Sequence, residues 1–401
     1  MSLSVKHLNG DATFLLSFSA IEDTRFSNGY SKRAGDFTIL LDPWLTGPST
    51  TFHPKFALTH RVVPSCIQHL SELSPPNVII ISQDKSDHCH EETLRQLPPE
   101  LKNTYILAQP AAAKKIRGWK YFNPEKVIAL PVFSDRRPDS SIIRFNIASP
   151  LRGGSPGEVT VAYMPAKRDV TGLHNAVGIT FCPPAINQYL TSPLSANFSR
   201  PFPTFYHQPM STSHSMSSTL SLPVQASPSY DDTPDTPSTA MDDTMSQASS
   251  VLYSPASSIS SAPSIHAPIS AKTLSVLFSP HGVSYNSIHP YVTSHLIHQA
   301  ALPLTCLLHS FDRIQNPWYL GGNISAGLPG GIEIVEKLLA RVWVGAHDED
   351  KDNSGWSVKQ IVTRKYSCQE VQALMNKERK GMKVGVEVKV LGSGEEMWLT
   401  A

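Results

Sequence analysis

The sequence has no long apolar run, no run of basic residues and little net charge. Its 401 residues carry 34 Lys and Arg against 33 Asp and Glu, a formal net charge of +1. This balance excludes the general electrostatic attraction by which basic proteins bind nucleic acid or an anionic membrane. No apolar stretch approaches the roughly 20 residues that span a bilayer, and the N-terminal region lacks the plan of a signal peptide. We therefore expect neither a nucleic-acid partner nor a membrane span.

Cysteine is also scarce, and the common motifs of several enzyme classes are absent. The five cysteines are odd in number and widely spaced, so they form neither a disulfide framework nor a CxxC zinc module. This usage predicts a reducing compartment, the cytoplasm, with the nucleus as the alternative. The phosphate-binding pattern GxxxxGK[ST] is missing, which leaves nucleotide binding without support. The Gly-x-Ser-x-Gly elbow of serine hydrolases is missing as well.

What the sequence does contain in excess is a segment rich in serine and proline. The 80 residues from Thr191 to Ser270 include 22 Ser, 11 Pro and 8 Thr. Such a composition buries too little apolar surface to offset its ordering entropy, so we expect disorder over 191–270. Patterned sequence resumes after it, which favours one folded domain made of residues 1–190 and 271–401. Two domains joined by a linker is the alternative.

The insertion also carries Ser-Pro and Thr-Pro pairs on which proline-directed kinases act, at Ser192, Ser227, Thr233, Thr236 and Ser254. Phosphorylation would add about −1.5 to −2 charges at each site. The insertion is therefore a candidate contact for a kinase or a protein partner. The alternative is that a segment of this composition yields such pairs by chance.

The rest of the chain alternates short Val- and Ile-rich strands with helical patterns, which predicts a layered α/β fold. The helical patterns cover 65–73, 91–97, 111–118, 291–300, 332–340 and 368–376. The strand patterns cover 13–18, 37–41, 78–81, 105–108, 127–131, 142–147, 159–163, 177–181, 274–278, 342–344 and 384–390.

The most informative stretch joins an apolar strand to a dense polar loop and then to a helix. After Val78–Ile81 come Gln83-Asp84-Lys85-Ser86-Asp87-His88-Cys89-His90-Glu91-Glu92. Loops at strand ends are where sites are commonly built on α/β sheets. The neighbouring carboxylate and imidazole of Asp87-His88 suit a divalent metal such as zinc. The alternative is a helix-capping loop in which Asp87 or Cys89 opens the helix and His88 is exposed.

This stretch resembles the metal-binding loop of the metallo-β-lactamase superfamily, His-x-His-x-Asp-His after a buried strand. The upstream Leu41-Asp42-Pro43-Trp44-Leu45 resembles the Asp-Pro-Trp strand end of the branch with lactonase-like and N-acylphosphatidylethanolamine phospholipase D-like members. The resemblance implies a four-layer αββα sandwich with the site at the shared edge of two sheets. It covers most of the chain outside the insertion.

Later segments align with the family in the same order. Met164-Pro165-Ala166-Lys167 stands where a histidine-bearing Pro-Ala-x-His is usual, and Leu277–Gly282 stands where an apolar strand ends in Gly-Asp. Val342–Asp348 fits the late strand that precedes the last histidine. The resemblance thereby implies His281 and His347 as ligands beside Asp87 and His88.

The departures from the family pattern are confined to one of its two metal positions. The three histidines of the first metal are replaced by Gln83, Lys85 and Lys167, and lysines repel a divalent cation. The set implied for the second metal reads Asp87, His88, His281 and His347, and each is a competent ligand.

Two hypotheses follow. The first is a hydrolase of a small-molecule ester, lactone or phosphodiester that uses one metal ion, zinc before iron or manganese. In it, Lys85 and Lys167 stabilise a developing oxyanion and Asp348 orients the metal-bound His347. The second is a catalytically inactive binding or scaffold protein of the same fold. Lysine ammonium groups would then fill the old site through structural salt bridges.

Overall fold

The computed structural model describes residues 1–20, 35–167, 169, 171–185, 272–378 and 385–401. These residues all belong to one compact unit. The insertion for which we predict disorder, 191–270, lies outside the described residues, as do the two predicted boundaries of the halves that flank it.

The first large sheet holds the N-terminal strands and one strand from the end of the chain. It is antiparallel from β20 to β3 and parallel from β3 to β8. Its strands, in spatial order, are β20 (Glu396–Thr400), β1 (Ser2–His7), β2 (Phe14–Ser19), β3 (Phe37–Leu41), β6 (Val78–Ile81), β7 (Tyr105–Ala108) and β8 (Val127–Ala129).

The second large sheet is built the same way from the later part of the chain. Its antiparallel strands lie on one side of β12 and its parallel strands on the other. Its strands, in spatial order, are β19 (Glu387–Lys389), β16 (Val342–Gly345), β13 (Cys306–His309), β12 (Leu274–Ser279), β11 (Asn175–Cys182), β10 (Gly157–Pro165) and β9 (Ile142–Ile147).

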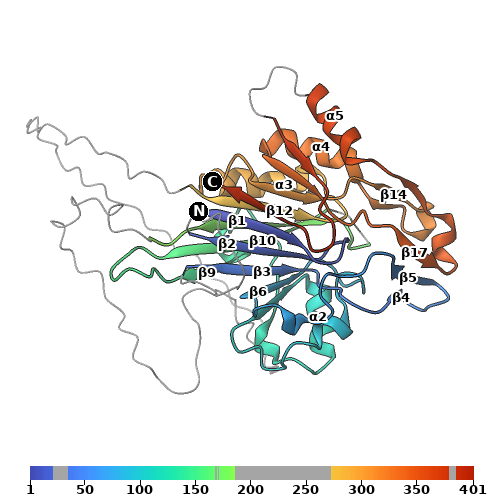
Figure 1. The fold of residues 1–401 in the computed structure, drawn as a ribbon, viewed down its shortest axis with the longest axis horizontal. Helices are drawn as coiled ribbons and strands as arrows, with labels where there is room; N and C mark the ends of the chain where they lie inside the picture. Colours follow the sequence, from blue (N-terminus) through green and yellow to red (C-terminus); the bar gives the residue numbers. More distant parts are fainter. Residues whose placement is uncertain (21–34, 168, 170, 186–271, 379–384) are drawn as a thin grey trace, which may run out of the picture. The chain divides into compact units, whose positions relative to one another are not determined.

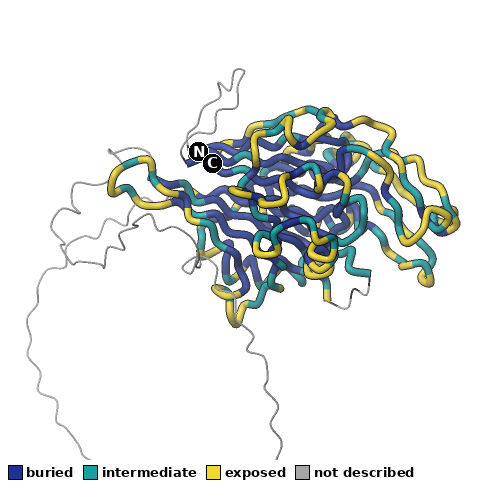
Figure 2. The backbone as a smooth tube through the Cα atoms, turned by 90° about the horizontal axis from the view of Figure 1, so that it is seen from below, coloured by how far each residue is buried: buried dark blue, intermediate teal, exposed yellow. Residues whose placement is uncertain are grey.

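Three apolar cores separate the layers. One lies between the two sheets and takes side chains from both, such as Phe18 and Phe181, which stack at 5.3 Å. In β6, Val78 and Ile80 enter this core, whereas Ile79 enters the core under the helices of the first sheet. This is the two-sided burial that an uninterrupted apolar strand predicts. The strands form the buried centre of Figure 2.

Helices cover the outer face of each sheet, so the order of layers is helix, sheet, sheet, helix (Figure 1). The first sheet is covered by α1 (Glu91–Leu94) and α2 (Pro110–Gly118), and the second by α3 (Tyr285–Tyr291), the π-helical η6 (Val292–Leu296), α4 (Gly327–Leu338) and α5 (Cys368–Glu378). This architecture confirms the predicted metallo-β-lactamase-like αββα sandwich. No helix in the described ranges is long and apolar enough to cross a membrane.

Several predicted helices differ from the observed ones. The pattern at 65–73 forms only the 3-10 turn η1 (Leu70–Glu72), and α4 begins at Gly327, five residues before the predicted start. The glycines of α4 have a packing role. A Cβ on Gly331 would lie 2.1 Å from the Trp343 ring, so only glycine lets the helix approach β16 this closely.

Two small sheets stand beside the large ones. One contains β4 (Ser49–Thr51), β5 (Ala57–Arg61) and β17 (Lys351–Ser354), and the other contains β14 (Arg313–Gln315), β15 (Asn323–Ser325) and β18 (Val362–Arg364). Short 3-10 turns connect the remaining segments: η2 (Pro124–Lys126), η3 (Asp139–Ser141), η7 (Trp318–Leu320) and η8 (Ser357–Gln360).

Candidate metal centre

Each of the three buried histidines follows the carboxyl end of a strand. His88 comes after β6 of the first sheet, whereas His281 and His347 come two residues after β12 and β16 of the second. Loops at strand ends of the two sheets thus bring together residues that are far apart in the sequence, as sites on α/β sheets commonly do.

The ring nitrogens of His88, His281 and His347 converge. Each offers one ligand atom, and these atoms all lie within 4.8 Å of one another. The Nε2 atoms of His88 and His281 are 3.0 Å apart. The Oδ2 atom of Asp87 lies 3.9 Å from Nε2 of His88 and 3.9 Å from Nε2 of His347. We call these four residues the candidate centre.

The outward nitrogen of every histidine faces an acceptor. Nδ1 of His88 lies 2.7 Å from Asp42 Oδ2, Nδ1 of His347 lies 2.8 Å from Asp11 Oδ1, and Nδ1 of His281 lies 2.9 Å from the Ile324 carbonyl oxygen. An imidazole that donates from Nδ1 keeps its lone pair on Nε2. Such partners orient metal-binding histidines in general.

Three neutral imidazoles arranged in this way would point three lone pairs at one point, with the Asp87 carboxylate 3.9 Å from two of the rings. Two bare lone pairs at a separation of 3.0 Å repel one another, and either a proton or a metal cation between the two nitrogens removes the repulsion. The donor set of nitrogen and oxygen suits zinc. The three histidines therefore fit a bound metal ion, by their own hydrogen-bonding pattern.

The backbone is in a conformation unfavourable for residues other than glycine at His347 and at Asp42, the partner of His88. Asp42 has φ 38° and His347 has φ 70°, both in the left-handed region. Such positions cost free energy and cluster at functional sites. Asp42 is held there by Ser82, whose backbone N–H and hydroxyl donate to its two carboxylate oxygens at 2.7 and 2.5 Å.

Burial and neighbouring charges divide the histidines of the candidate centre. Burial lowers the pKa of His281 well below its usual value, and the two neighbouring imidazoles add to this effect. Burial also lowers the pKa of His347, although the Asp11 carboxylate opposes it. For His88 the same burial is outweighed by Asp87 and Asp42, so its pKa is raised. Without a metal, His88 is therefore the histidine of the three that most readily takes up a proton, next to the carboxylates of Asp87 and Asp42.

A lysine shares the carboxylate that holds His347. Lys351 Nζ lies 2.9 Å from Asp11 Oδ1 and 3.2 Å from His347 Nδ1. Asp11 is fully buried, and burial alone would raise its pKa, but the charges of His347 and Lys351 lower it far below its usual range. The carboxylate thus stays ionised beside His347 and Lys351.

The residues at the family's first metal position do not converge on the histidines. The Lys85 ammonium pairs with Asp84 at 3.0 Å, and Lys167 is exposed. Gln83 is buried and donates from its amide to the Leu173 carbonyl at 3.0 Å, while its Oε1 atom has no hydrogen-bond partner among the described residues.

Asp348 occupies a different place from the one expected. We predict it as the acceptor that orients His347, but its carboxylate accepts hydrogen bonds from the backbone N–H groups of Phe311 and Asp312 at 2.8–3.0 Å. Burial, with Asp312 nearby, raises the pKa of Asp348 to about 8. The expected contact is made by Asp11 instead. Asp348 ties the end of β16 to the loop after β13.

The alternative, in which Asp87 or Cys89 caps the helix and His88 is exposed, does not describe the observed loop. The residue that caps α1 is His90, whose Nδ1 accepts from the Thr93 N–H, and neither Asp87 nor Cys89 opens the helix. His88 is fully buried. Burial raises the pKa of the Cys89 thiol to about 12, which excludes a reactive thiolate at neutral pH.

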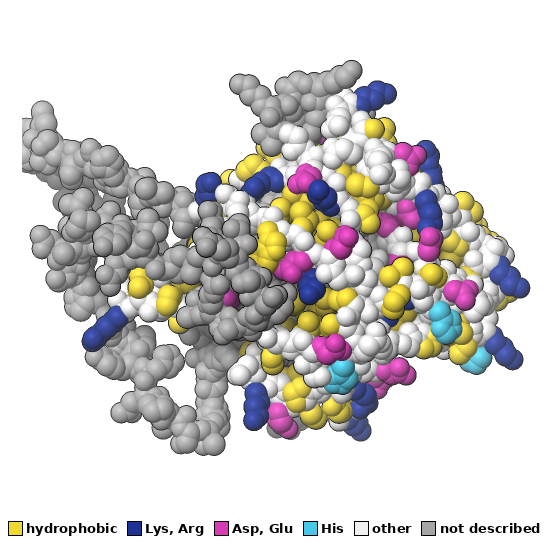
Figure 3. Space-filling view, in the orientation of Figure 1, with side chains coloured by type: hydrophobic (Ala, Val, Ile, Leu, Met, Phe, Trp, Pro, Cys, Tyr) yellow, Lys and Arg dark blue, Asp and Glu magenta, His cyan; other side chains and the backbone are white. Residues whose placement is uncertain are grey.

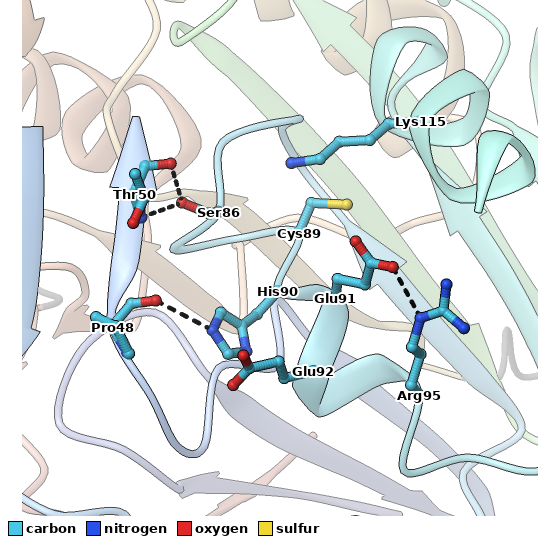
Figure 4. Close-up of a pocket in the computed structure, with 9 residues that line it drawn as sticks. All are labelled: Pro48, Thr50, Ser86, Cys89, His90, Glu91, Glu92, Arg95 and Lys115. Atoms are coloured by element: carbon cyan, nitrogen blue, oxygen red, sulfur yellow. Dashed lines mark hydrogen bonds and ion pairs between the residues drawn. The ribbon is translucent and has the colours of Figure 1, made fainter. Parts of the chain in front are cut away.

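A cavity of about 370 Å³ lies on the outer side of α1 and the loop before it (Figure 4). It is lined by Pro48, Thr50, Ser86, Cys89, His90, Glu91, Glu92, Arg95 and Lys115. None of the residues of the candidate centre lines it. Its charged groups are largely paired, Arg95 with Glu91 at 2.8 Å and Lys115 with the Asp84 carbonyl at 2.7 Å.

Comparisons with known proteins add a likeness in overall structure. No protein-family model matches the chain, and no curated protein matches it at a significant level. Among solved structures, Igni18, a metallo hydrolase from the archaeon Ignicoccus hospitalis KIN4/I, matches with a TM-score of 0.44 and 9% identity over 100% of both chains. An isothiocyanate hydrolase from Delia radicum gut bacteria matches with a TM-score of 0.41 and 12% identity over 99% of this chain and 98% of that one. At these values the likeness identifies no activity.

Sequence reasoning missed the residues that hold the histidines in place. Asp11 sits in the turn Asn9-Gly10-Asp11, which carries no motif, and Lys351 reads as part of an acidic turn. Asp42 had a signal, because a lone carboxylate directly after an apolar strand is a common feature of site loops. The Ile324 carbonyl is a backbone group and leaves no trace in the sequence.

Proposed function

We propose that the chain is a metal-dependent hydrolase that uses one divalent ion, held by His88, His281 and His347 with Asp87 as the fourth ligand. The observation that carries the proposal is the convergence of three histidine rings. Each ring offers one nitrogen to the cluster, and the Nδ1 atom of each ring faces an acceptor. When bound there, a divalent ion supplies Lewis acidity toward a carbonyl or phosphoryl oxygen. Zinc is the ion that this donor set favours.

The chain's own groups prepare the site for this ion. Asp42, Asp11 and the Ile324 carbonyl fix the rings, so that no histidine has to reorient on binding. The side chain of Asp87 is 22% exposed, whereas those of His88 and His347 are 0% and 5% exposed. Among Asp87, His88 and His347, Asp87 is therefore the residue nearest to solvent. The low pKa that His88 and Lys351 give Asp87, against the effect of its burial, keeps it an ionised acceptor.

The substrate class that we propose is a small ester, lactone or phosphodiester. Lys85, whose side chain is 30% exposed, is the cation nearest in sequence to Asp87 that could face a developing oxyanion. We assign no such role to Asp348, because its carboxylate is occupied by backbone N–H groups. For Lys167, the proposed role in stabilising the oxyanion rests on its position in the sequence alone.

One observation favours a second function, binding without turnover. The Lys85 ammonium is already paired with Asp84 at 3.0 Å, as expected for a structural salt bridge in a site that has lost its catalytic function. The two functions differ in one outcome. A hydrolase turns over a member of a panel of esters, lactones and phosphodiesters when loaded with metal, whereas a scaffold protein binds the metal and turns over none.

Metal analysis of the purified chain tests the proposal. We expect about one ion per chain in the wild type, and loss of most of it in His88→Ala and in His347→Ala. The exposed His60→Ala serves as the matched control and should keep the wild-type content. A wild-type chain that holds no zinc, manganese or iron after reloading sinks the proposal.

A further inference from the structure

Aromatic side chains are exposed on the two small sheets, where a water-soluble surface normally has few. Trp318, Phe52, Tyr319 and Trp356 are 87%, 89%, 57% and 55% exposed, and Phe56 lies between Phe52 and Trp356. We call these five residues the aromatic edge. Among the described residues, seven of the twelve large exposed hydrophobic side chains lie in the segments 49–63, 313–325 and 350–366. Clustering of this kind marks an interaction surface.

Specific contacts join the aromatic edge across both small sheets. The Phe56 ring lies 5.4 Å from the Phe52 ring and 5.9 Å from the Trp356 ring. The Trp356 N–H donates to the Lys55 carbonyl at 3.0 Å, and η8 follows directly. At the other end of η8, the Tyr319 hydroxyl donates to Gln360 Oε1 at 2.7 Å. The aromatic edge is thus one connected surface.

The exposed charge around these aromatic residues is positive. The segments 49–63, 313–325 and 350–366 contain seven Lys and Arg against two Asp and Glu, whereas the whole chain is balanced at +1. Lys351 is held against the buried Asp11 and Arg61 is half-buried, which leaves five exposed cations against two exposed carboxylates. One of the two acidic residues, Asp350, is paired with Lys365. Figure 3 shows Lys, Arg and His side chains, together with some Asp and Glu, among hydrophobic ones at the end where Figure 1 places β4, β5, β14 and β17. The balanced composition of the chain conceals this local excess.

We propose that the aromatic edge docks the protein on an anionic phospholipid surface. Tryptophan and tyrosine are the side chains that settle at the boundary of headgroups and acyl chains, because their rings are apolar with one polar atom. Lysine and arginine beside them are attracted by the negative leaflet. Two exposed aliphatic side chains, Val62 at 61% and Val362 at 67%, add apolar surface that suits acyl chains better than nucleic-acid bases.

The same surface is directly connected to the candidate centre. Lys351, which begins β17, follows His347 by four residues, and Thr50 of β4 donates its backbone N–H to the Ser86 hydroxyl at 2.8 Å, two residues before His88. Docking through these strands places the candidate centre close to the lipid headgroups. The proposal does not require that the centre be catalytic.

Flotation of the full chain with vesicles tests the proposal. We expect the wild type to float with vesicles of phosphatidylcholine containing about 30% phosphatidylserine and not with phosphatidylcholine alone, and to be released by salt. Lys55→Gln with Lys359→Gln should lower the partition coefficient roughly 25-fold, since each lysine near an anionic surface contributes about fivefold. Trp318→Ala with Trp356→Ala should lower it roughly tenfold or more.

Matched exposed substitutions outside the three segments control for non-specific effects. Ile297→Ala with Val132→Ala removes apolar surface, and Arg136→Gln with Arg137→Gln removes charge, and both pairs should float like the wild type. The proposal is overturned if the wild type does not float. It is also overturned if the two tryptophan substitutions leave flotation unchanged. A wild type that does not float but binds an oligonucleotide, or associates with itself, through the same tryptophans would assign the aromatic edge to that partner instead.

Discussion

Nδ1 of His347 lies 2.8 Å from Oδ1 of Asp11, and this contact joins the last ligand of the candidate centre to the turn after the first strand. Asp11 lies in a loop of the first large sheet and His347 in a loop of the second. They share Lys351 as a third partner, whose Nζ atom lies 2.9 Å from the same carboxylate oxygen of Asp11. His347 also carries a left-handed φ of 70°. The contact therefore compensates for an unfavourable backbone and sets the direction of the ring.

Removing the Asp11 carboxylate should weaken metal binding without removing a ligand. We expect Asp11→Asn to lower zinc affinity about 10- to 100-fold, because the amide no longer fixes the tautomer and orientation of His347. Competition with a chromophoric chelator measures this.

Two further variants separate orientation from fold. Asp352→Asn changes an exposed carboxylate on β17 and should bind zinc like the wild type. Lys351→Met, paired with Asp11→Asn, removes the ammonium that would otherwise stay buried without its counter-charge. If zinc affinity is unchanged in Asp11→Asn while its thermal unfolding matches the wild type, Asp11 does not position the ligand.

The stability of the fold should depend on pH through His295, which lies away from the candidate centre. Its Nε2 contacts the Thr160 hydroxyl at 3.0 Å. Burial lowers the pKa of His295 to about 4, Arg144 and His298 add to this effect, and Asp139 opposes it. The unfolded chain takes up a proton near pH 6.5 and the folded chain only near pH 4, so this contribution, present above 6.5, is lost as pH falls between these values. The full loss is about 3 kcal/mol.

Urea unfolding at several pH values checks the sign. His295→Gln should flatten the decline in the free energy of unfolding between about pH 6.5 and pH 4. The exposed His298→Gln should keep most of the slope. Equal slopes in the wild type and His295→Gln contradict the prediction.

Shortening the predicted insertion should leave the fold and the candidate centre intact. Phe181 of β11 pairs directly with Leu274 of β12, so the segment between them closes a single antiparallel pair. Neighbouring strands lie about 4.8 Å apart, a gap that a short linker spans. Replacing 186–271 by about eight Gly and Ser residues should stabilise the fold by at most about 2 kcal/mol, because loop closure costs little per doubling of length.

Thermal unfolding and zinc content measure the effect of this deletion. Loss of the folded state in the shortened chain would show that the insertion contributes contacts to the domain. The wild type, expressed in parallel, is the control.

Gly178 of β11, which packs against Tyr291 at the end of α3, should not tolerate a methyl group. A Cβ on Gly178 would lie 2.4 Å from the Tyr291 ring, whose hydroxyl is buried without a partner among the described residues. We expect Gly178→Ala to cost about 1–3 kcal/mol by overpacking. Gly118→Ala, where a Cβ meets nothing within 4 Å, should be neutral or slightly stabilising. Denaturant unfolding of the two variants gives the comparison, and equal stabilities would show that the Tyr291 ring moves freely.

Strands with continuous apolar residues could be predicted from the sequence, because local composition decides them. Val78–Ile81 and Leu274–Ser279 are of this kind, and both are observed. β1 was missed because its alternating sequence, Ser2–His7, gains its partners from β2 and from the distant β20. The short strands of the small sheets are mostly exposed and show no apolar period, so only tertiary contacts define them.

The site divides in the same way. The ligand types and their order along the chain are sequence properties, and their resemblance to the family pattern implied Asp87, His88, His281 and His347. The partners of the rings depend on which loops meet in space. Asp348, next to His347 in sequence, points to the backbone of Phe311, and Asp11, far away in sequence, takes the contact.

The pairing of β1 with β20 has a consequence for synthesis of the protein in the cell. Ser4 and Glu396 contact each other across a separation of 392 residues. A ribosome that adds about 5–20 residues per second needs on the order of tens of seconds to cover this separation. Throughout that time, one hydrogen-bonding edge of β1 has no partner, and an open strand edge invites association with other nascent chains. Asp11 follows β1 by four residues, so the carboxylate that faces His347 lies next to a strand whose second edge stays open until β20 has been made.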